Sequence, residues 1–286
     1  MSSRISLMLL LCLPAGPLAA QSVQARNNVV TITVTDSAYH APDTIAAGFT
    51  TVRLVNKGNE RHMAHLVRLD SGRTVEEFVK AYAEAIRTVG PRPVWAKRYG
   101  GPGAAPHAES SAMQYLEPGT YAMLCLMSHR GGIQGTPHFM TGMVGTLVVR
   151  AGDAAAPAQT PPKATVVIRL VEYAFVLNRP LTAGRHVIRV ESRGALPHEV
   201  GILKLPRGKT AADFQAWVRN PQGPPPVSES PRASGTGGGV AQLSPSLDAY
   251  FTIDLTPGEY VLFCFVTAPD GRPHSDHGMI QQIRID

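Results

Sequence analysis

The sequence predicts an all-β protein made of two similar β-sandwich domains in tandem, each with one short inserted helix. Three observations support this prediction. Glycine (27 residues) and proline (24 residues) are abundant, which favours a chain with many turns. Short runs of alternating β-branched residues recur along the chain, as expected for half-buried strands. The second half of the chain also repeats the first at an offset of 136 residues.

The repeat sets the expected domain boundaries. Residues 34–69 align without a gap with residues 170–205, and the segments PGTYAMLC and PGEYVLFC align further along. The residue pairs that fall together are Gly48 and Gly184, Gly58 and Gly194, His62 and His198, Cys125 and Cys264, His138 and His274, and Met143 and Met279. We therefore expect one domain over residues 24–150 and a second over residues 164–286. Between them, residues 151–163 (AGDAAAPAQTPPK) have the composition of a linker.

Each domain is expected to contain the same elements in the same order. The first two strands are predicted over residues 29–34 and 50–56, and over residues 165–170 and 186–192. A third strand begins at the shared histidine, and a short helix follows it. The helix TVEEFVKAYAEAI starts with a capping box of Thr74 and Glu77, and TAADFQAWV starts with a weaker one of Thr210 and Asp213. Of the last two strands, one ends at the cysteine and the other starts after the methionine.

The first twenty residues have the pattern of a secretory signal peptide. Arg4 precedes an apolar run from Leu7 to Leu13, and small residues follow up to Ala20. Cleavage after Ala20 would release a periplasmic or secreted protein. No later apolar run approaches the roughly 18 residues that a membrane-spanning helix needs, so no membrane span is expected.

The composition also limits the partners that we expect. Hydrophobic residues make up 44% of the chain, enough for ordinary globular cores. The formal net charge is +6, but Lys and Arg form no blocks of the kind that bind nucleic acids. A nucleic-acid partner is therefore not expected.

Four side chains that bind metals recur in both halves. They are His62, Cys125, His138 and Met143 in the first half, and His198, Cys264, His274 and Met279 in the second. Thiolate and thioether sulfur suit Cu(I), whereas imidazole serves both oxidation states of copper. Two histidines and a cysteine with a weak axial methionine therefore suit a one-electron copper site. The sequence predicts copper as the cofactor.

Both halves resemble cupredoxins, the blue-copper proteins. The resemblance rests on GALPHEVGI (residues 194–202) and PGEYVLFC…PHSDHGM in the second half, and on GNERHMAHL and PGTYAMLC…PHFMTGMVG in the first. It implies Greek-key β-sandwiches and type-1-like sites whose ligands are the eight residues named above. One feature departs from small blue-copper proteins. Twelve residues separate Cys125 from His138 and nine separate Cys264 from His274, whereas that family usually has only a few.

Other interpretations of single residues stay open at this point. Each cysteine could be a small buried hydrophobic residue, or Cys125 and Cys264 could form a disulfide. His129 also follows Cys125, but Gln134 rather than a methionine lies five residues later. The unrepeated His65 and His277 (each three residues from a predicted ligand) are expected at the surface or next to the sites.

The sequence favours an exported copper-binding protein that carries single electrons. Two alternatives remain, a copper storage or delivery protein and an interaction module with vestigial sites. Two-domain copper enzymes place a histidine beside the cysteine and use His-x-His pairs for further copper ions. Neither cysteine has such a neighbour and the chain has no His-x-His pair, so we expect a protein that is not an enzyme. Its expected partner is a redox or copper-exchange protein.

Overall fold

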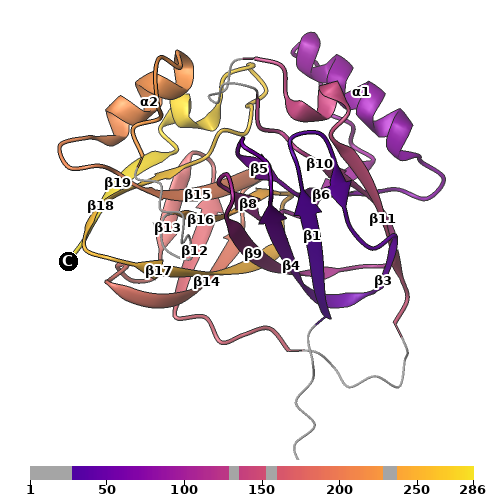
Figure 1. Cartoon of the computed structure of the whole chain (residues 1–286), viewed down its shortest axis with the longest axis horizontal. Coiled ribbons are helices and arrows are strands. Elements are labelled where there is room, and N and C mark those ends of the chain that lie inside the picture. Colours follow the sequence, from indigo (N-terminus) through magenta and orange to yellow (C-terminus); the bar gives the residue numbers. More distant parts are fainter. Residues whose placement is uncertain (1–27, 129–134, 153–159, 228–236) are drawn as a thin grey trace, which may run out of the picture.

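The computed structural model describes residues 28–128, 135–152, 160–227 and 237–286 (Figure 1). The predicted signal peptide and His129 lie outside the described residues. In the described part of the chain, neither helix is long and apolar enough to cross a membrane.

The first half consists of short strands and one helix. Its elements are β1 (Asn28–Val34), β2 (Tyr39–His40), β3 (Thr44–Ala46), β4 (Gly48–Asn56), β5 (His62–Met63), β6 (His65–Leu69), α1 (Val75–Arg87), β7 (Ala96–Arg98), β8 (Gly103–Ala104), β9 (Glu109–Leu116), β10 (Gly119–Leu124), the 3-10 turn η1 (His138–Thr141) and β11 (Val144–Arg150). The predicted strands and helix of this half are therefore confirmed within a few residues.

The second half repeats this order. Its elements are β12 (Val166–Val171), β13 (Ala174–Leu177), β14 (Gly184–Ser192), β15 (His198–Lys204), α2 (Ala211–Arg219), β16 (Gly237–Leu243), β17 (Asp248–Leu255), β18 (Gly258–Phe263), the 3-10 turn η2 (His274–His277) and β19 (Ile280–Ile285). The prediction of an all-β fold is confirmed, with α1 and α2 as the inserted helices.

Each half is a sandwich of two main sheets around its own core, and in the first half β5 and β8 pair as a separate two-stranded sheet. In the first half, β2-β1-β4-β9 face β3-β11-β10-β6-β7, and in the second, β13-β12-β14-β17 face β16-β15-β18-β19. Inward side chains of alternating strand positions, such as Ile32, Leu54 and Leu147, fill the first core. Ile168, Ile202 and related residues fill the second core in the same way.

The helices pack on the outer faces of the sandwiches. Phe78 and Tyr82 of α1 contact residues of β6 and β10, and Phe214 of α2 belongs to a cluster with Val261 of β18. Both helices begin with a complete capping box, at Thr74 and at Thr210, as the sequence predicts. Figure 1 shows α1 and α2 on the same side of the molecule, at its two ends.

The two halves share one continuous sheet. Strand β9 pairs with β17 antiparallel, so the sheets of both halves join in the order β13-β12-β14-β17-β9-β4-β1-β2. At the centre of this joint Ala112 pairs with Phe251, and these two residues occupy the same position in the repeat. The halves are thus related by a local two-fold axis at this pair. Ala112 is buried in the hydrophobic core of the second half, so that core depends on the joint.

His65 is not at the surface, the first of its two expected positions, but is buried beside the strand that leads to Cys125. It lies on β6 opposite Leu124 of β10 and is only 1% exposed. Neither ring nitrogen has a hydrogen-bond partner among the described residues. In the second half Gly201 takes this position, and a Cβ there would lie 2.2 Å from the ring of Phe263. The space that His65 occupies in one half is therefore filled by an aromatic ring in the other.

The joint predicts that both halves unfold together. Each half has one tryptophan, Trp95 or Trp217, so the variants Trp95→Phe and Trp217→Phe leave one fluorescent reporter each. We expect both reporters to give the same denaturation midpoint. Ala112→Asp places an unpaired charge in the joint and should lower the free energy of unfolding by roughly 3–5 kcal/mol. Both reporters should register that loss.

The neighbouring Ser111→Asp is the matched control, because Ser111 is exposed on the same strand. It should shift the midpoint little. Two separate transitions, with only one of them sensitive to Ala112→Asp, would show that the joint does not couple the halves.

The buried His65 predicts a pH-dependent stability of the copper-free protein. Burial, helped by the nearby charge of Arg98, lowers the pKa of His65 to about 3 from an ordinary value near 6.5. Above pH 6.5 the ring is neutral in both states, so its contribution there is constant. As the pH falls from 6.5 through 3, the unfolded chain takes up the proton first, and stability is lost.

We therefore expect His65→Leu to flatten the dependence of the unfolding free energy on pH between about 3 and 6.5. Chemical denaturation at a series of pH values measures this slope. The exposed His40, replaced by leucine, is the control. An unchanged slope in His65→Leu would contradict the prediction.

Candidate metal centres

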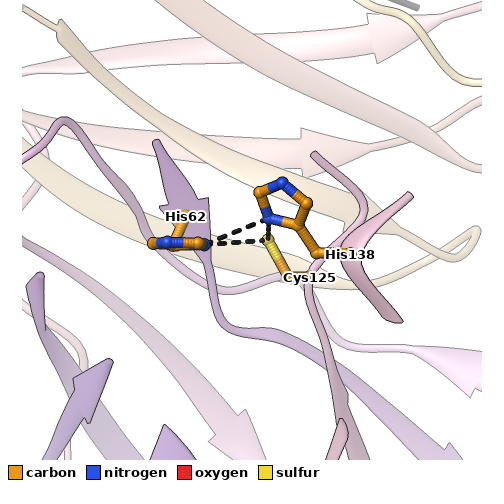
Figure 2. A group of neighbouring side chains, drawn as sticks. All are labelled: His62, Cys125 and His138. Carbon is orange, nitrogen blue, oxygen red and sulfur yellow. Dashed lines mark hydrogen bonds between the residues drawn. The ribbon is translucent and has the colours of Figure 1, made fainter. Parts of the chain in front are cut away.

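The first cluster is assembled from three separate parts of the first sandwich. His62 opens β5, Cys125 follows the last residue of β10, and His138 opens the turn η1. Figure 2 shows the two rings and the thiol pointing toward one another. All three side chains are buried, with at most 1% of each residue exposed. The fold thus brings together three of the four residues predicted as ligands in this half.

The donor atoms of this cluster are close enough to share one ion. The Sγ atom of Cys125 lies 3.7 Å from Nδ1 of His62 and 3.5 Å from Nδ1 of His138 (Figure 2). The two Nδ1 atoms lie 3.2 Å apart. Imidazole nitrogen and thiolate sulfur bind a first-row metal such as zinc at about 2.0–2.3 Å. An ion among these three atoms would therefore be within bonding distance of each.

The second cluster repeats this geometry. His198 opens β15, Cys264 follows β18, and His274 opens η2. Nδ1 of His198 lies 3.0 Å from Nδ1 of His274, which is 3.5 Å from Sγ of Cys264. These three residues are fully buried. In each cluster the three donor atoms all lie within 4.8 Å of one another.

Backbone hydrogen bonds close each ligand loop in the same way. In the first half the N–H of His138 donates to Met127, that of Phe139 to Cys125, and that of Met143 to His138. The equivalent bonds in the second half run from His274 to Val266, from Ser275 to Cys264, and from Met279 to His274. The loops differ in length, yet both return the second histidine to the same place. The unusual spacing between Cys and His is thereby accommodated.

Each closing turn ends with a left-handed glycine. Gly142 has a φ of 106° and Gly278 a φ of 103°, a conformation that other residues rarely adopt. The chain then enters the last strand through Met143 or Met279. Both methionines are buried, and their carbonyl groups accept the N–H of Cys125 (3.5 Å) and of Cys264 (3.0 Å). Their role as axial ligands stays a prediction.

Burial sets the protonation of the cluster in the absence of metal. It raises the pKa of Cys125 to about 11 and that of Cys264 further still, so both thiols are neutral. Burial also lowers the pKa of His274 to about 4, so its imidazole keeps a free lone pair at neutral pH. A bound cation would displace the thiol proton and pair with the thiolate.

The environment of the first cluster contains two polar side chains that the sequence did not single out. Glu60 places Oε2 2.7 Å from Nε2 of His138. The hydroxyl of Tyr39 donates to the carbonyl of Met63 and also contacts the thiol of Cys125. The second half has Leu196 and Phe175 at these repeat positions, so the repeat itself gave no signal for them.

Other interpretations of the cysteines and histidines can now be compared with the structure. Cys125 and Cys264 are both free thiols in separate clusters, so they form no disulfide. His277 lies next to the second site, which is one of its two expected positions. Its ring stacks on Tyr173 at 4.6 Å between centroids, and Tyr173 also packs edge-on against His274.

The donor set of each cluster fits copper. A buried thiolate and two imidazoles combine a soft ligand with two that accept both oxidation states. Both sets are enclosed by sheet residues and closing turns, which limits the movement of the ligands. Copper is therefore the metal that these residues indicate.

Comparisons with known proteins give distant matches. No family model and no curated protein matches the chain. An auracyanin from Roseiflexus castenholzii is 20% identical over 44% of this chain and 98% of that chain, with a TM-score of 0.29. Auracyanin A, a blue copper protein from Chloroflexus aurantiacus, is 21% identical over 43% and 100%, with a TM-score of 0.30. A copper nitrite reductase from Nitrosomonas europaea is 15% identical over 91% and 94%, with a TM-score of 0.26.

The expectation that the protein is not an enzyme is contradicted by these comparisons. The similar structures include copper nitrite reductases and multicopper oxidases, whose matches extend over 91% of this chain. That expectation rested on the missing His-x-His pairs and on the residues beside the cysteines. Those features concern additional copper ions of one particular type, and they do not exclude catalysis.

The two halves have the same fold and the same kind of cluster at the same end of the sandwich. Each half is a two-sheet sandwich whose last two strands are joined by a turn that carries ligands. Each also holds a buried His–Cys–His cluster at that end. Each half therefore has the two-sheet sandwich and the buried His–Cys–His cluster that its resemblance to cupredoxins implies, and copper is the metal that the two clusters indicate.

Proposed function

We propose that this protein is an exported copper protein whose two sites carry single electrons. The observation that supports this most directly is the convergence of two imidazoles and one thiol, twice, in the same buried geometry. The domains would span residues 24–150 and 164–286, joined by the linker 151–163. The proposed ligands are His62, Cys125, His138 and Met143 in one site and His198, Cys264, His274 and Met279 in the other.

The surroundings of the ligands suit electron transfer. Copper held there would supply a one-electron couple between its two oxidation states. Two of the ligands in each site are fixed by backbone hydrogen bonds of the closing turn, and the first histidine is fixed on a strand. Because the ligands are held before the metal binds, little rearrangement accompanies a change of charge. Burial of all three side chains excludes water as an additional ligand.

Export and a protein partner belong to the same proposal. The first twenty residues would direct the chain out of the cytoplasm, where copper-binding thiols survive if they are buried or bound to metal. Both cysteines are buried, which protects them from oxidation. The partner would be a redox or copper-exchange protein.

Replacement of the cysteines tests whether each cluster holds one copper. We expect the mature protein to take up two equivalents of copper and to show an intense visible absorption band from Cu(II)–thiolate bonds. Cys125→Ser and Cys264→Ser should each lose one equivalent and about half of the band. The double variant should lose both, while the fold, followed by circular dichroism, is kept.

The outcome also separates the proposal from its alternatives. Tight Cu(I) binding without reversible oxidation would indicate storage or delivery instead of electron transfer. Failure of the unaltered protein to bind copper would indicate a module with vestigial sites. Either result would overturn the proposal.

Replacement of the methionines tests the axial position. An axial ligand tunes the reduction potential of a trigonal copper site without being needed to hold the ion. Met143→Leu and Met279→Leu should therefore keep the copper stoichiometry but shift the reduction potential of their own site, measured by voltammetry. Met123→Leu is the control, because Met123 is a buried methionine of β10 in the same core. Equal potentials in all three variants would remove the methionines from the ligand set.

A further inference from the structure

A carboxylate lies behind the first histidine of each cluster. Oδ1 of Asp36 is 2.9 Å from Nε2 of His62, on the side of the ring away from the thiol. In the second half, Oε1 of Glu172 is 3.7 Å from Nε2 of His198, which is close but beyond hydrogen-bond distance. Asp36 and Glu172 occupy the same position in the repeat, although their side chains differ in length. Both sites therefore have an acid at one equivalent place.

Each carboxylate is held in place by the loop that precedes the histidine. Asp36 accepts hydrogen bonds from the N–H groups of Asn59 (2.8 Å) and Glu60 (3.0 Å). Glu172 accepts one from the N–H of Leu196 (2.9 Å). The hydrogen bond from Asn59, followed by that from His62, holds the pKa of Asp36 well below its usual range. That from Leu196 lowers the pKa of Glu172.

The same contact explains a repeated glycine. A Cβ at Gly58 would lie 2.1 Å from Oδ1 of Asp36, and a Cβ at Gly194 would lie 2.4 Å from Oε1 of Glu172. Neither glycine has a positive φ, so backbone conformation does not require them. The carboxylate occupies the space that a side chain at either position would need. Both halves thus keep room for an acid behind the ligand histidine.

A carboxylate at Nε2 decides which ring nitrogen is free. A neutral imidazole carries one N–H, and a charged carboxylate can only accept it. At His62 this contact favours the N–H on Nε2 and directs the lone pair of Nδ1 toward the thiol and the second histidine. Acids in this position also raise the basicity of a ligand histidine, and their loss typically costs 10–100-fold in metal affinity.

We propose that Asp36 is a positioning residue that fixes the tautomer and orientation of His62 for copper, and that Glu172 acts on His198 in the same sense from a longer distance. Only the expected effect on copper binding rests on the proposed function. The tautomer is a property of the copper-free protein as well, so it can be measured independently.

The effect should be larger at the first site. Asp36 is closer to its histidine than Glu172 is, and it is held by more backbone N–H groups. Glu60 adds a second carboxylate, at Nε2 of His138. Its repeat equivalent is Leu196, and Nε2 of His274 has no hydrogen-bond partner among the described residues. The first site therefore depends more strongly on acidic side chains.

The experiment compares Asp36→Ala and Asp36→Asn in a Cys264→Ser background, so that only the first site binds copper. Asp36→Asn keeps an oxygen acceptor but removes the charge, whereas Asp36→Ala removes both. Asp43→Ala is the control, because Asp43 is an exposed acid of the same half. Nitrogen-15 NMR of the copper-free protein reports the tautomer of His62, and titration with copper reports the affinity.

We expect His62 to lose its single Nε2–H tautomer in Asp36→Ala and the affinity for Cu(II) to fall about 10–100-fold. Asp36→Asn should restore the tautomer and most of the affinity, but with a higher reduction potential because the negative charge is gone. Glu172→Ala, tested in a Cys125→Ser background, should show a smaller loss.

Two results would overturn the inference. One is an unchanged tautomer in Asp36→Ala, whether or not copper binds. The other is a loss of affinity in Asp36→Ala that is no larger than in Asp43→Ala. If the unaltered protein binds no copper, the proposed function fails, and the NMR comparison still decides whether Asp36 positions His62.

Discussion

The backbone hydrogen bonds that close the loop between the last two strands are the constraint on which both sites depend. In each half, the N–H of the cysteine donates to the carbonyl of the methionine that precedes the last strand. The N–H of this methionine donates to the carbonyl of the second histidine. Antiparallel pairing of β10 with β11, and of β18 with β19, continues this ladder along the whole strand. The cysteine, the second histidine and the methionine of each half are therefore positioned by one turn. Only the first histidine lies outside this turn, and packing of the core between the sheets sets its distance from the cysteine.

Backbone hydrogen bonds between strands also set the arrangement of the two halves. A lone cupredoxin-like half would leave β9 or β17 as an unpaired edge, and an unpaired edge invites association with other chains. Pairing β9 with β17 covers both edges at once and places the repeat-equivalent residues Ala112 and Phe251 opposite each other. The remaining ends of this sheet, β2 and β13, are only two and four residues long. Short edges of this kind offer little backbone for further pairing.

Much of this could be predicted because the repeat showed which residues matter in both halves. It identified the strands, the helices with Thr74 and Thr210 at their starts, and the His and Cys residues that form the clusters. It could not reveal the β9–β17 joint, since pairing between distant strands depends on packing that a local pattern does not contain. Asp36 and Glu172 were overlooked because they differ in type, and an acid in a loop is usually only a solvated group. The burial of His65 could not be predicted, because it has no repeat equivalent and nothing local distinguishes a buried histidine from an exposed one.

The two clusters have the same donors but different surroundings, and this difference is the physical meaning of the imperfect repeat. Around the first cluster, the carboxylates of Asp36 and Glu60 lie at Nε2 of His62 and of His138, and the hydroxyl of Tyr39, which donates to the carbonyl of Met63, lies beside Cys125. Around the second, Leu196 and Phe175 replace Glu60 and Tyr39, while Glu172 keeps an acid at the position of Asp36. The half-buried carboxyl of Glu199 accepts the N–H of Phe265 next to Cys264. Duplication thus preserved the geometry that holds a metal while the electrostatics of each site diverged, because the ligands are fixed by backbone and core and the neighbours are not.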